Sequence, residues 1–208
     1  MNTLTALQWR YAVNTFSSQR LTDQQIALLI ESTRLAPSAF GLQPLKLIVI
    51  SDQQLKEKLL PYSYGQEKVV QCSHLLVLAH YVGDPQTLVD NYFKQYCKEN
   101  NKEAHQILSY RQQVSKFVNS MDHAAFDKWS SEQAYIALGT LLTAAAFNQI
   151  DSCPMTGFEQ QQYDDILALN NSNFKTTVIC PVGLRAKSDK YANNAKVRNS
   201  LEQFADMR

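Results

Sequence analysis

The chain has 208 residues, of which 45% are hydrophobic, and its 20 basic residues nearly balance its 19 acidic ones. This length and composition predict a single domain over residues 1–208 and exclude a disordered chain. The formal net charge of +1 gives no general attraction to nucleic acid or to an anionic membrane, so any anion site would have to be built locally. No signal-peptide pattern opens the sequence and no apolar run is long enough to span a bilayer. We therefore expect a cytoplasmic protein that binds neither nucleic acid nor a membrane.

Helical periodicity and capping signals predict six helices. Thr22 and Gln25 form a capping box at the start of the second helix, and Pro37 disfavours helical geometry in the residue before it, so that helix should end at Ala36. Asp52 is expected to cap the third helix. The predicted helices cover about residues 3–12, 22–36, 53–60, 86–99, 103–120 and 130–147.

The last predicted helix is rich in Ala, Gly and Thr, which allows close packing on several of its sides. We expect a central helix, buried by its own domain, by a partner subunit, or by both. Ser130 and Gln133 would form its capping box, and Asn148 would supply a left-handed C-cap.

The strands are expected where β-branched and aliphatic residues gather, at residues 45–51, 74–80 and 176–184. A few strands among many helices predict an α+β fold. No GxGxxG motif opens a helix after a strand, which argues against a dinucleotide-binding fold.

The four cysteines and four histidines are scattered along the chain. There is no CxxC pair and no spacing typical of zinc ligands, so we expect no metal site. The thiols should be reduced and mostly buried.

Three segments contain residues that could carry chemistry. Arg10 lies in WRYAVNTF, beside aromatic residues. Lys196 and Arg198 are two positions apart, and in an extended segment such residues face the same way, so both cations can point at one phosphate. The segment DSCPMTGFE follows the small-residue helix, and Gly157 lets its backbone lie close to a flat ligand. Taken singly, these segments are also explained by a solvated arginine, a common basic pair and a connecting loop.

The order of these motifs is more specific than any one of them. An Arg-aromatic helix precedes APSAFGLQP, which leads into a strand, and SYGQEKVVQCSHLLVLAH places a Lys ahead of a Ser-His pair that opens the next strand. The small-residue helix then runs into PMTGF, and VICPVG is followed by K-x-R. Over about residues 5–200 this order resembles the nitroreductase family, the FMN-dependent NAD(P)H oxidoreductases of the oxygen-insensitive bacterial type. The likeness is loose over about residues 83–128.

The resemblance implies a nitroreductase-like α+β fold, with a central, mainly antiparallel sheet flanked by helices and FMN bound at the interface of an intertwined homodimer. One subunit would supply most FMN contacts, and the other would supply the loop with Pro37 and Ser38. NADH or NADPH would pass a hydride to FMN N5, and a small-molecule acceptor such as a nitroaromatic or quinone would then take its place, giving ping-pong kinetics. The chemistry resides on the cofactor, so no catalytic side chain is expected.

The resemblance also implies roles for particular residues. Arg10, Lys196 and Arg198 would grip the FMN phosphate, because a phosphate needs two or three cations in a protein without a net positive field. Gln66 and Lys68 would lie near the ribityl chain and the ring, and PMTG would run along the isoalloxazine. The expected cofactor-binding residues are Arg10, Tyr11, Ala12, Asn14, Pro37, Ser38, Ala39, Gly41, Gln66, Lys68, Pro154, Met155, Thr156, Gly157, Lys196 and Arg198.

Two aromatic residues are expected near the substrate. Phe117 would line the substrate channel, and Phe40 would either pack at the dimer seam or shape that channel. Three positions depart from the family's pattern: Asn14 stands where Lys or Arg is frequent, Gly41 where Asn is usual, and Thr156 where Glu is usual. Because Asn14 brings no charge toward flavin N1 and O2, we expect a lower flavin potential than in a relative with lysine there.

Three alternatives stay open. The same fold carries other reactions, namely dehalogenation, enone reduction and flavin breakdown, and residues 83–128 are where their signatures would lie. The chain could instead be a flavin-binding or other small-molecule-binding module without redox activity, which Asn14, Gly41 and Thr156 would favour. The last alternative is an α+β protein without flavin, whose three basic residues are simply solvated.

Overall fold

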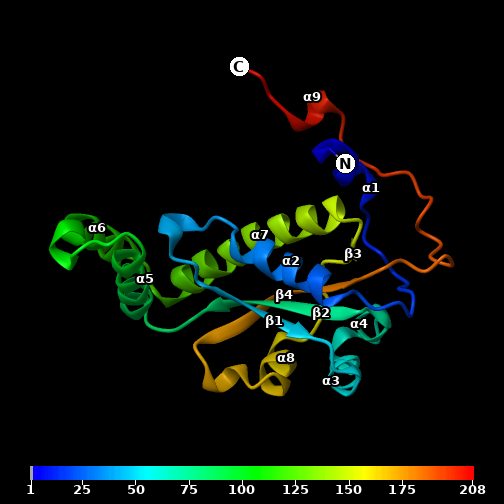
Figure 1. Cartoon of the computed structure of the whole chain (residues 1–208), viewed down its shortest axis with the longest axis horizontal. Coiled ribbons are helices and arrows are strands. Elements are labelled where there is room, and N and C mark those ends of the chain that lie inside the picture. The colour runs from blue at the N-terminus through cyan, green and yellow to red at the C-terminus, as the bar shows by residue number, and fades with distance from the viewer. Residues whose placement is uncertain (1) are drawn as a thin grey trace.

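Four strands form one antiparallel sheet in the order β1-β2-β4-β3 in the computed structural model, which describes residues 2–208 (Figure 1). The predicted α+β class and antiparallel sheet are confirmed, and so are the three predicted strands. The two-residue strand β3 was not predicted, because it lies inside a segment that reads as a loop. The strands are β1 (Leu45–Ile50), β2 (His74–Tyr81), β3 (Asp151–Ser152) and β4 (Phe174–Gly183).

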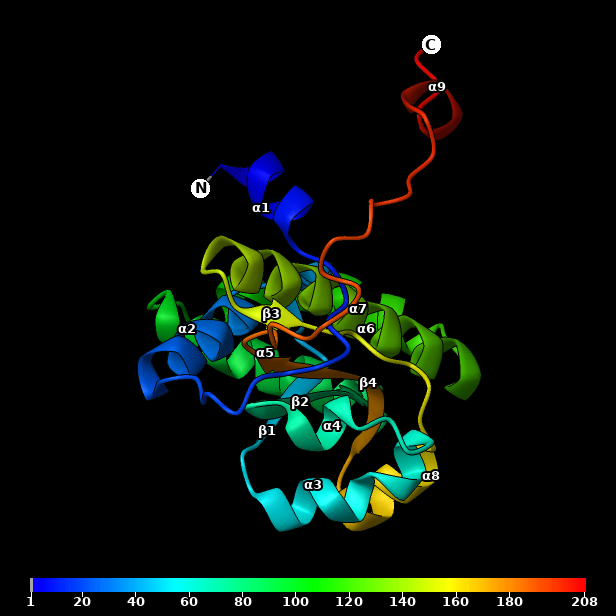
Figure 2. The ribbon, with the colours of Figure 1, turned by 90° about the vertical axis from the view of Figure 1, so that its right-hand side faces the viewer.

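Helices cover both faces of this sheet (Figures 1 and 2). One face carries α2 and α7, and the other carries α3 and α8. The helices are α1 (Thr3–Trp9), α2 (Asp23–Arg34), α3 (Gln53–Leu59), α4 (Lys68–Gln71), α5 (Pro85–Glu99), α6 (Leu108–Asn119), α7 (His123–Phe147), α8 (Gln160–Ile166) and α9 (Leu201–Phe204), with 3-10 turns at Ala39–Gly41, Pro61–Ser63, Ala104–Ile107 and Leu169–Asn171.

Residues 75–79 of strand β2 are all apolar because both faces of the strand are buried. Leu76 and Leu78 point into the cluster formed with α2 and α7. Leu75 and Val77 point the other way, into the cluster formed with α3 and α8. Side chains alternate across a strand, so a two-sided core requires an unbroken apolar run of this kind.

A third apolar cluster joins α5 and α6, which project from one end of the molecule (Figure 1). At the other end, residues 185–208 leave the body as an extended C-terminal arm that passes beside α1 and carries the short α9 (Figure 2). The arm exposes large apolar side chains: Val197, Leu201 and Phe204 are 86%, 79% and 81% exposed.

The predicted capping box of the central helix is wrong. Helix α7 begins at His123, because the Asp122 carboxylate caps it by accepting from the Ala125 N–H at 2.8 Å. Ser130 and Gln133 therefore lie inside the helix, where both are buried. The capping box at Thr22 and the cap at Asp52 are confirmed.

Two other predicted helix ends are also wrong. Asn148 has φ −96°, and the left-handed residue is Gln149, with φ 53°. Gln149 donates to Ala146 O and Ile150 to Ala145 O, the pattern of a Schellman motif, in which the buried Ile150 fixes where the helix stops. Helix α1 ends at Trp9 instead of residue 12, because the following residues run extended beside β3.

Candidate functional site

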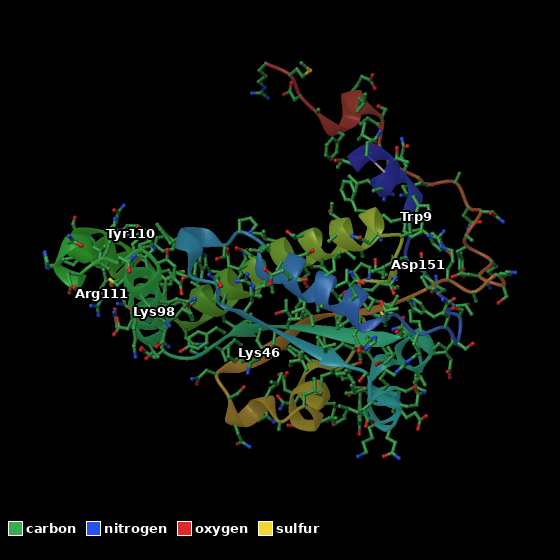
Figure 3. The ribbon with its side chains drawn as sticks, in the orientation of Figure 1. Trp9, Lys46, Lys98, Tyr110, Arg111 and Asp151 are labelled. Atoms are coloured by element: carbon green, nitrogen blue, oxygen red, sulfur yellow. The ribbon has the colours of Figure 1, made fainter. Side chains whose placement is uncertain are left out.

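A cavity of about 540 Å³ lies where the N-terminal segment meets the C-terminal arm. It brings together segments that are far apart in the sequence, and on this side of the molecule Figure 3 shows Trp9 and Asp151. The lining residues are Gln8, Trp9, Arg10, Tyr11, Ala12, Asn14, Pro154, Tyr191, Ala192, Asn194, Ala195, Lys196, Val197 and Arg198. The three predicted phosphate-binding cations therefore lie around one cavity.

These cations crowd one another without a carboxylate among the described lining residues. Burial lowers the pKa of Arg10, and the nearby Arg198 cation lowers it further. Burial also lowers the pKa of Lys196, as do both arginines. The Arg10 Nε is buried and has no hydrogen-bond partner in the described part of the chain. A bound anion would relieve both the repulsion and the unpaired donor.

Lys196 is held by the end of a helix. Its ammonium donates to the carbonyls of Leu7, Gln8 and Arg10 at 2.5, 3.1 and 2.5 Å. The last carbonyls of a helix lack intrahelical partners and carry partial negative charge, so an ammonium there is well placed. Lys196 thus fastens the C-terminal arm to α1, and Arg10 and Arg198 remain as the cations with free donors.

A second group of predicted residues lies beside this cavity. The Lys68 ammonium donates to Asn14 Oδ1 at 2.7 Å and lies 3.7 Å from Cys153 Sγ. Gln66 Nε2 donates to the Gly157 carbonyl at 3.0 Å. The segment before β2 is therefore bound both to the N-terminal segment and to PMTG. Asn14 carries no positive charge, but the Lys68 ammonium that it binds does.

The PMTG segment offers backbone groups rather than side chains. Met155 is buried, and its N–H donates to Ile179 O at 2.8 Å, so that N–H is not available to a ligand. Thr156 and Gly157 are exposed, and their N–H groups have no partner within residues 2–208. Of the predicted flavin-facing amides, these two remain.

Two residues that sequence reasoning missed hold these segments in place. The Asp189 carboxylate accepts from the N–H groups of Asn14, Thr15 and Tyr191 at 2.8, 3.0 and 2.9 Å. Burial raises the pKa of Asp189, but these backbone donors together outweigh it and leave the pKa below its ordinary value. A single aspartate in a polar segment gives no sequence signal of this role.

Arg185 is the second missed residue. Its guanidinium lies between two rings, 4.2 Å from the centre of Trp9 and 4.5 Å from that of Tyr11. It also pairs with the buried Asp151 carboxylate at 2.6 Å. The stack fixes the wall of the cavity, since both aromatic residues line it.

The remaining predicted residues lie at the opposite end of the molecule, in the loop of residues 37–44 and on α6. Phe40 packs on Phe117 with ring centres 5.0 Å apart, which brings the two predicted channel residues together. Gly41 packs on Tyr92 of α5. Figure 3 shows Tyr110 and Arg111 at this α6 end, far from Trp9. Pro37, Ser38, Ala39, Phe40, Gly41 and Phe117 therefore do not meet the cationic cavity of their own chain.

The described residues hold no helix long and apolar enough to cross a membrane. Within the same range, no three His, Cys, Asp or Glu side chains are grouped as metal ligands would be. The four cysteines are free, and only Cys97 is partly exposed, which confirms the predicted unpaired, mostly buried thiols.

Comparison with known proteins decides the family. The sequence matches the Nitroreductase family over residues 7–184. The chain belongs to the nitroreductase family. A relative named as an NAD(P)H nitroreductase, YfkO of Bacillus subtilis (strain 168), is 32% identical over 213 residues, covering 96% of this chain and 94% of its own.

Solved structures of nitroreductases share the fold. The protein ydfN of Bacillus subtilis, named as a nitroreductase, has a TM-score of 0.87 at 22% identity, over 98% of this chain and 97% of its own. A protein of Exiguobacterium sibiricum, named in the same way and solved in complex with FMN, has a TM-score of 0.85 at 16% identity, over 100% and 98%. The nitroreductase-like fold predicted from the motifs is confirmed.

Proposed function

We propose that two copies of this chain form a homodimer that binds FMN between them and reduces an electron-poor small molecule, such as a nitroaromatic or a quinone. The class of activity follows from the family: the chain is an NAD(P)H-dependent oxidoreductase with FMN as its cofactor. The observation that carries the assignment of the site is the cavity whose described lining residues include three cations and no carboxylate.

The cationic cavity fits the phosphate of FMN. Within residues 2–208, the buried Arg10 Nε has no partner, and Arg198 donates only to the neighbouring Val197 carbonyl. Two guanidinium groups can bind a phosphate through paired N–H donors. Lys196 adds positive charge while its ammonium remains on the carbonyls of α1.

The groups beside the cavity fit the polar edge of a flavin ring. FMN, when bound, takes a hydride from NAD(P)H and passes reducing equivalents to the acceptor. Lys68 places a positive charge there, and Asn14 holds that ammonium in position. Thr156 and Gly157 are exposed, and within residues 2–208 no partner accepts from their N–H groups. A fixed cation and fixed N–H donors stabilise negative charge that develops near them.

A second copy is proposed because one chain separates the predicted site residues. The 37–44 loop lies at the α5–α6 end, whereas the cavity lies at the α1 end. The outer face of α7 also exposes Ile136 and Phe147 around a groove of about 520 Å³. Together with the exposed apolar side chains of the C-terminal arm, this surface is typical of a subunit interface.

The proposal includes a cytoplasmic location, with which four free thiols agree. It includes no nucleic-acid partner, in keeping with the net charge of +1.

The test is flavin binding followed by anaerobic reduction. The purified protein should be yellow, should bleach with NADH or NADPH, and should give ping-pong kinetics with a nitroaromatic or quinone. Arg198→Gln should weaken FMN binding by about 10- to 100-fold, the loss expected for charge-assisted hydrogen bonds, and should leave riboflavin binding unchanged. Lys58→Gln, which removes an exposed charge from α3, is the control.

Two outcomes would contradict the proposal. A colourless protein that does not bind added FMN would show that the chain binds no flavin. A yellow protein that neither nucleotide bleaches would overturn the reductase activity and support a flavin-binding module.

A further inference from the structure

The 37–44 loop has an unusual backbone. Phe40, Gly41 and Gln43 have φ values of 55°, 72° and 50°. The left-handed region is open to glycine, but it is strained for the other two residues, and above all for a bulky aromatic residue. Three such residues within four positions do not persist unless the surroundings hold them.

Burial alone does not explain why this conformation persists. Leu42 and Pro44 are buried, but the residues with positive φ are not: Phe40 and Gly41 are only partly buried, and Gln43 is exposed. Within the loop, the Gln43 N–H donates to Ser38 Oγ at 2.9 Å, which closes the turn. Any further restraint has to come from the elements beneath the loop.

Phe40 packs on Phe117 of α6 and Gly41 on Tyr92 of α5, and helix α7 adds hydrogen bonds at both ends of the loop. Gln133 Oε1 accepts from the Ala39 N–H at 2.9 Å, and Gln133 Nε2 donates to Trp129 O at 3.1 Å, which fixes the orientation of the amide. Ser130 Oγ donates to Pro44 O at 3.2 Å. The side chains are 5% and 0% exposed.

Both anchors lie one helical turn apart on the same face of α7, because residues three apart are neighbours on a helix surface. They are the two residues whose S-x-x-Q pattern reads as a capping box. Polar groups buried in the middle of an Ala-rich helix cost stability unless they are paired, and here their partners are the backbone groups of this loop.

We propose that Gln133, assisted by Ser130, is a positioning residue that holds the 37–44 loop of its own subunit in this strained shape. In the proposed dimer, the loop so held is presented to the flavin ring in the site of the partner subunit. The inference rests on the proposed function. It assigns to α7 a role in the cofactor site of the partner subunit, although neither side chain touches the cationic cavity of its own chain.

Gln133→Met is the main test, since methionine keeps the length of the side chain and removes both hydrogen-bonding groups. Gln133→Glu is the rescue variant. Burial raises the pKa of a carboxyl group, and the protonated acid keeps both an acceptor and a donor. Ser131→Ala is the matched control for Ser130→Ala, because Ser131 is only partly buried and bonds to its own helix at Lys128 O.

The first readout is amide hydrogen exchange of the protein without flavin. Peptides that cover the loop should exchange about tenfold faster in Gln133→Met. Exchange should stay near the wild-type rate in Gln133→Glu and Ser131→Ala, and Ser130→Ala should give a smaller increase. Unchanged loop exchange in both Gln133→Met and Ser130→Ala would overturn the anchoring.

The second readout is the affinity for FMN and for riboflavin, measured in parallel. A displaced loop removes contacts to the ring, so Gln133→Met should weaken both flavins by the same factor, about three- to tenfold, with recovery in Gln133→Glu. Arg198→Gln should weaken FMN alone. Faster loop exchange with unchanged affinity for both flavins would overturn the role in the cofactor site.

The two proposals can fail separately. If the wild-type protein binds neither flavin, the proposed function is wrong, and so is the role of Gln133 in the cofactor site. The hydrogen-exchange result still decides whether Gln133 anchors the loop. If Gln133→Met does not fold, Ser130→Ala measured against its control Ser131→Ala still tests the anchoring.

Discussion

Asp189 gives the sharpest prediction, because one carboxylate ties the N-terminal segment to the C-terminal arm. It is 4% exposed and accepts three backbone N–H groups, from Asn14, Thr15 and Tyr191. A hydrogen bond to a charged group contributes about 1.5–3 kcal/mol. The contributions of the three hydrogen bonds do not simply add, because Tyr191 is exposed and water can replace Asp189 as the acceptor of its N–H. We expect Asp189→Ala to lower the free energy of unfolding by about 2–4 kcal/mol, and Asp189→Asn, which keeps an acceptor oxygen, by about half of that.

The sign of the pH dependence follows from the depressed pKa of this carboxyl. The folded pKa lies below the ordinary 3.8, so Asp189 contributes stability above about pH 4, and this contribution is lost as pH falls through the folded value. Asp189→Asn should therefore show a smaller loss of stability than wild type between pH 5 and about pH 3. Urea unfolding at one fixed protein concentration measures both effects, since the stability of the proposed dimer would depend on concentration. An Asp189→Ala variant within about 0.5 kcal/mol of wild type would refute the reasoning.

Three further substitutions test other parts of the molecule. Gly183→Ala should destabilise by about 1–3 kcal/mol in urea unfolding, because its Cβ would lie 2.9 Å from the Phe16 ring; an unchanged midpoint would show that the ring moves aside at little cost. Lys68→Met should lower the two-electron flavin potential by roughly 20–40 mV, the equivalent of about 1–2 kcal/mol. If a spectroelectrochemical titration finds no shift, Lys68 does not lie at the flavin edge. Asp127→Ala should cost about 1–3 kcal/mol, since it leaves the buried His80 Nε2, now 2.5 Å from Asp127 Oδ1, without a partner; equal stability of wild type and variant would contradict this.

Local signals in the sequence predicted local structure well. The capping box at Thr22 and the cap at Asp52 form because each depends on residues three positions apart. Ser130 and Gln133 have the same spacing, yet they lie inside a 25-residue helix. A pattern of two polar residues cannot show that Asp122 caps the helix earlier, nor that a loop 86 and 94 residues away will bind both side chains.

The candidate site was predictable to the extent that its residues form ordered motifs. Lys196 and Arg198 both line one cavity, and their joint binding of one phosphate stays a prediction. Their spacing could not show that the carbonyls of α1 bind the lysine, because that contact depends on where a distant helix ends. For the same reason the sequence could not show that the Lys68 ammonium donates to Asn14 Oδ1, because the fold brings these two distant residues together.

The separation of the site residues in one chain makes the dimer testable by complementation. A subunit with Arg10→Gln and Arg198→Gln loses two cations of its cavity but keeps an intact 37–44 loop. A subunit with Gly41→Val keeps its cavity but loses its loop, because position 41 has φ 72° and a side chain there would press on Tyr92. If the partner's loop completes each cavity, a mixed dimer has one intact site out of two, although both parent dimers are inactive. Random assortment makes half of the dimers mixed, so about a quarter of the wild-type sites should recover activity. Activity of the co-expressed mixture no higher than the mean of the two parents would mean that each chain builds its site alone.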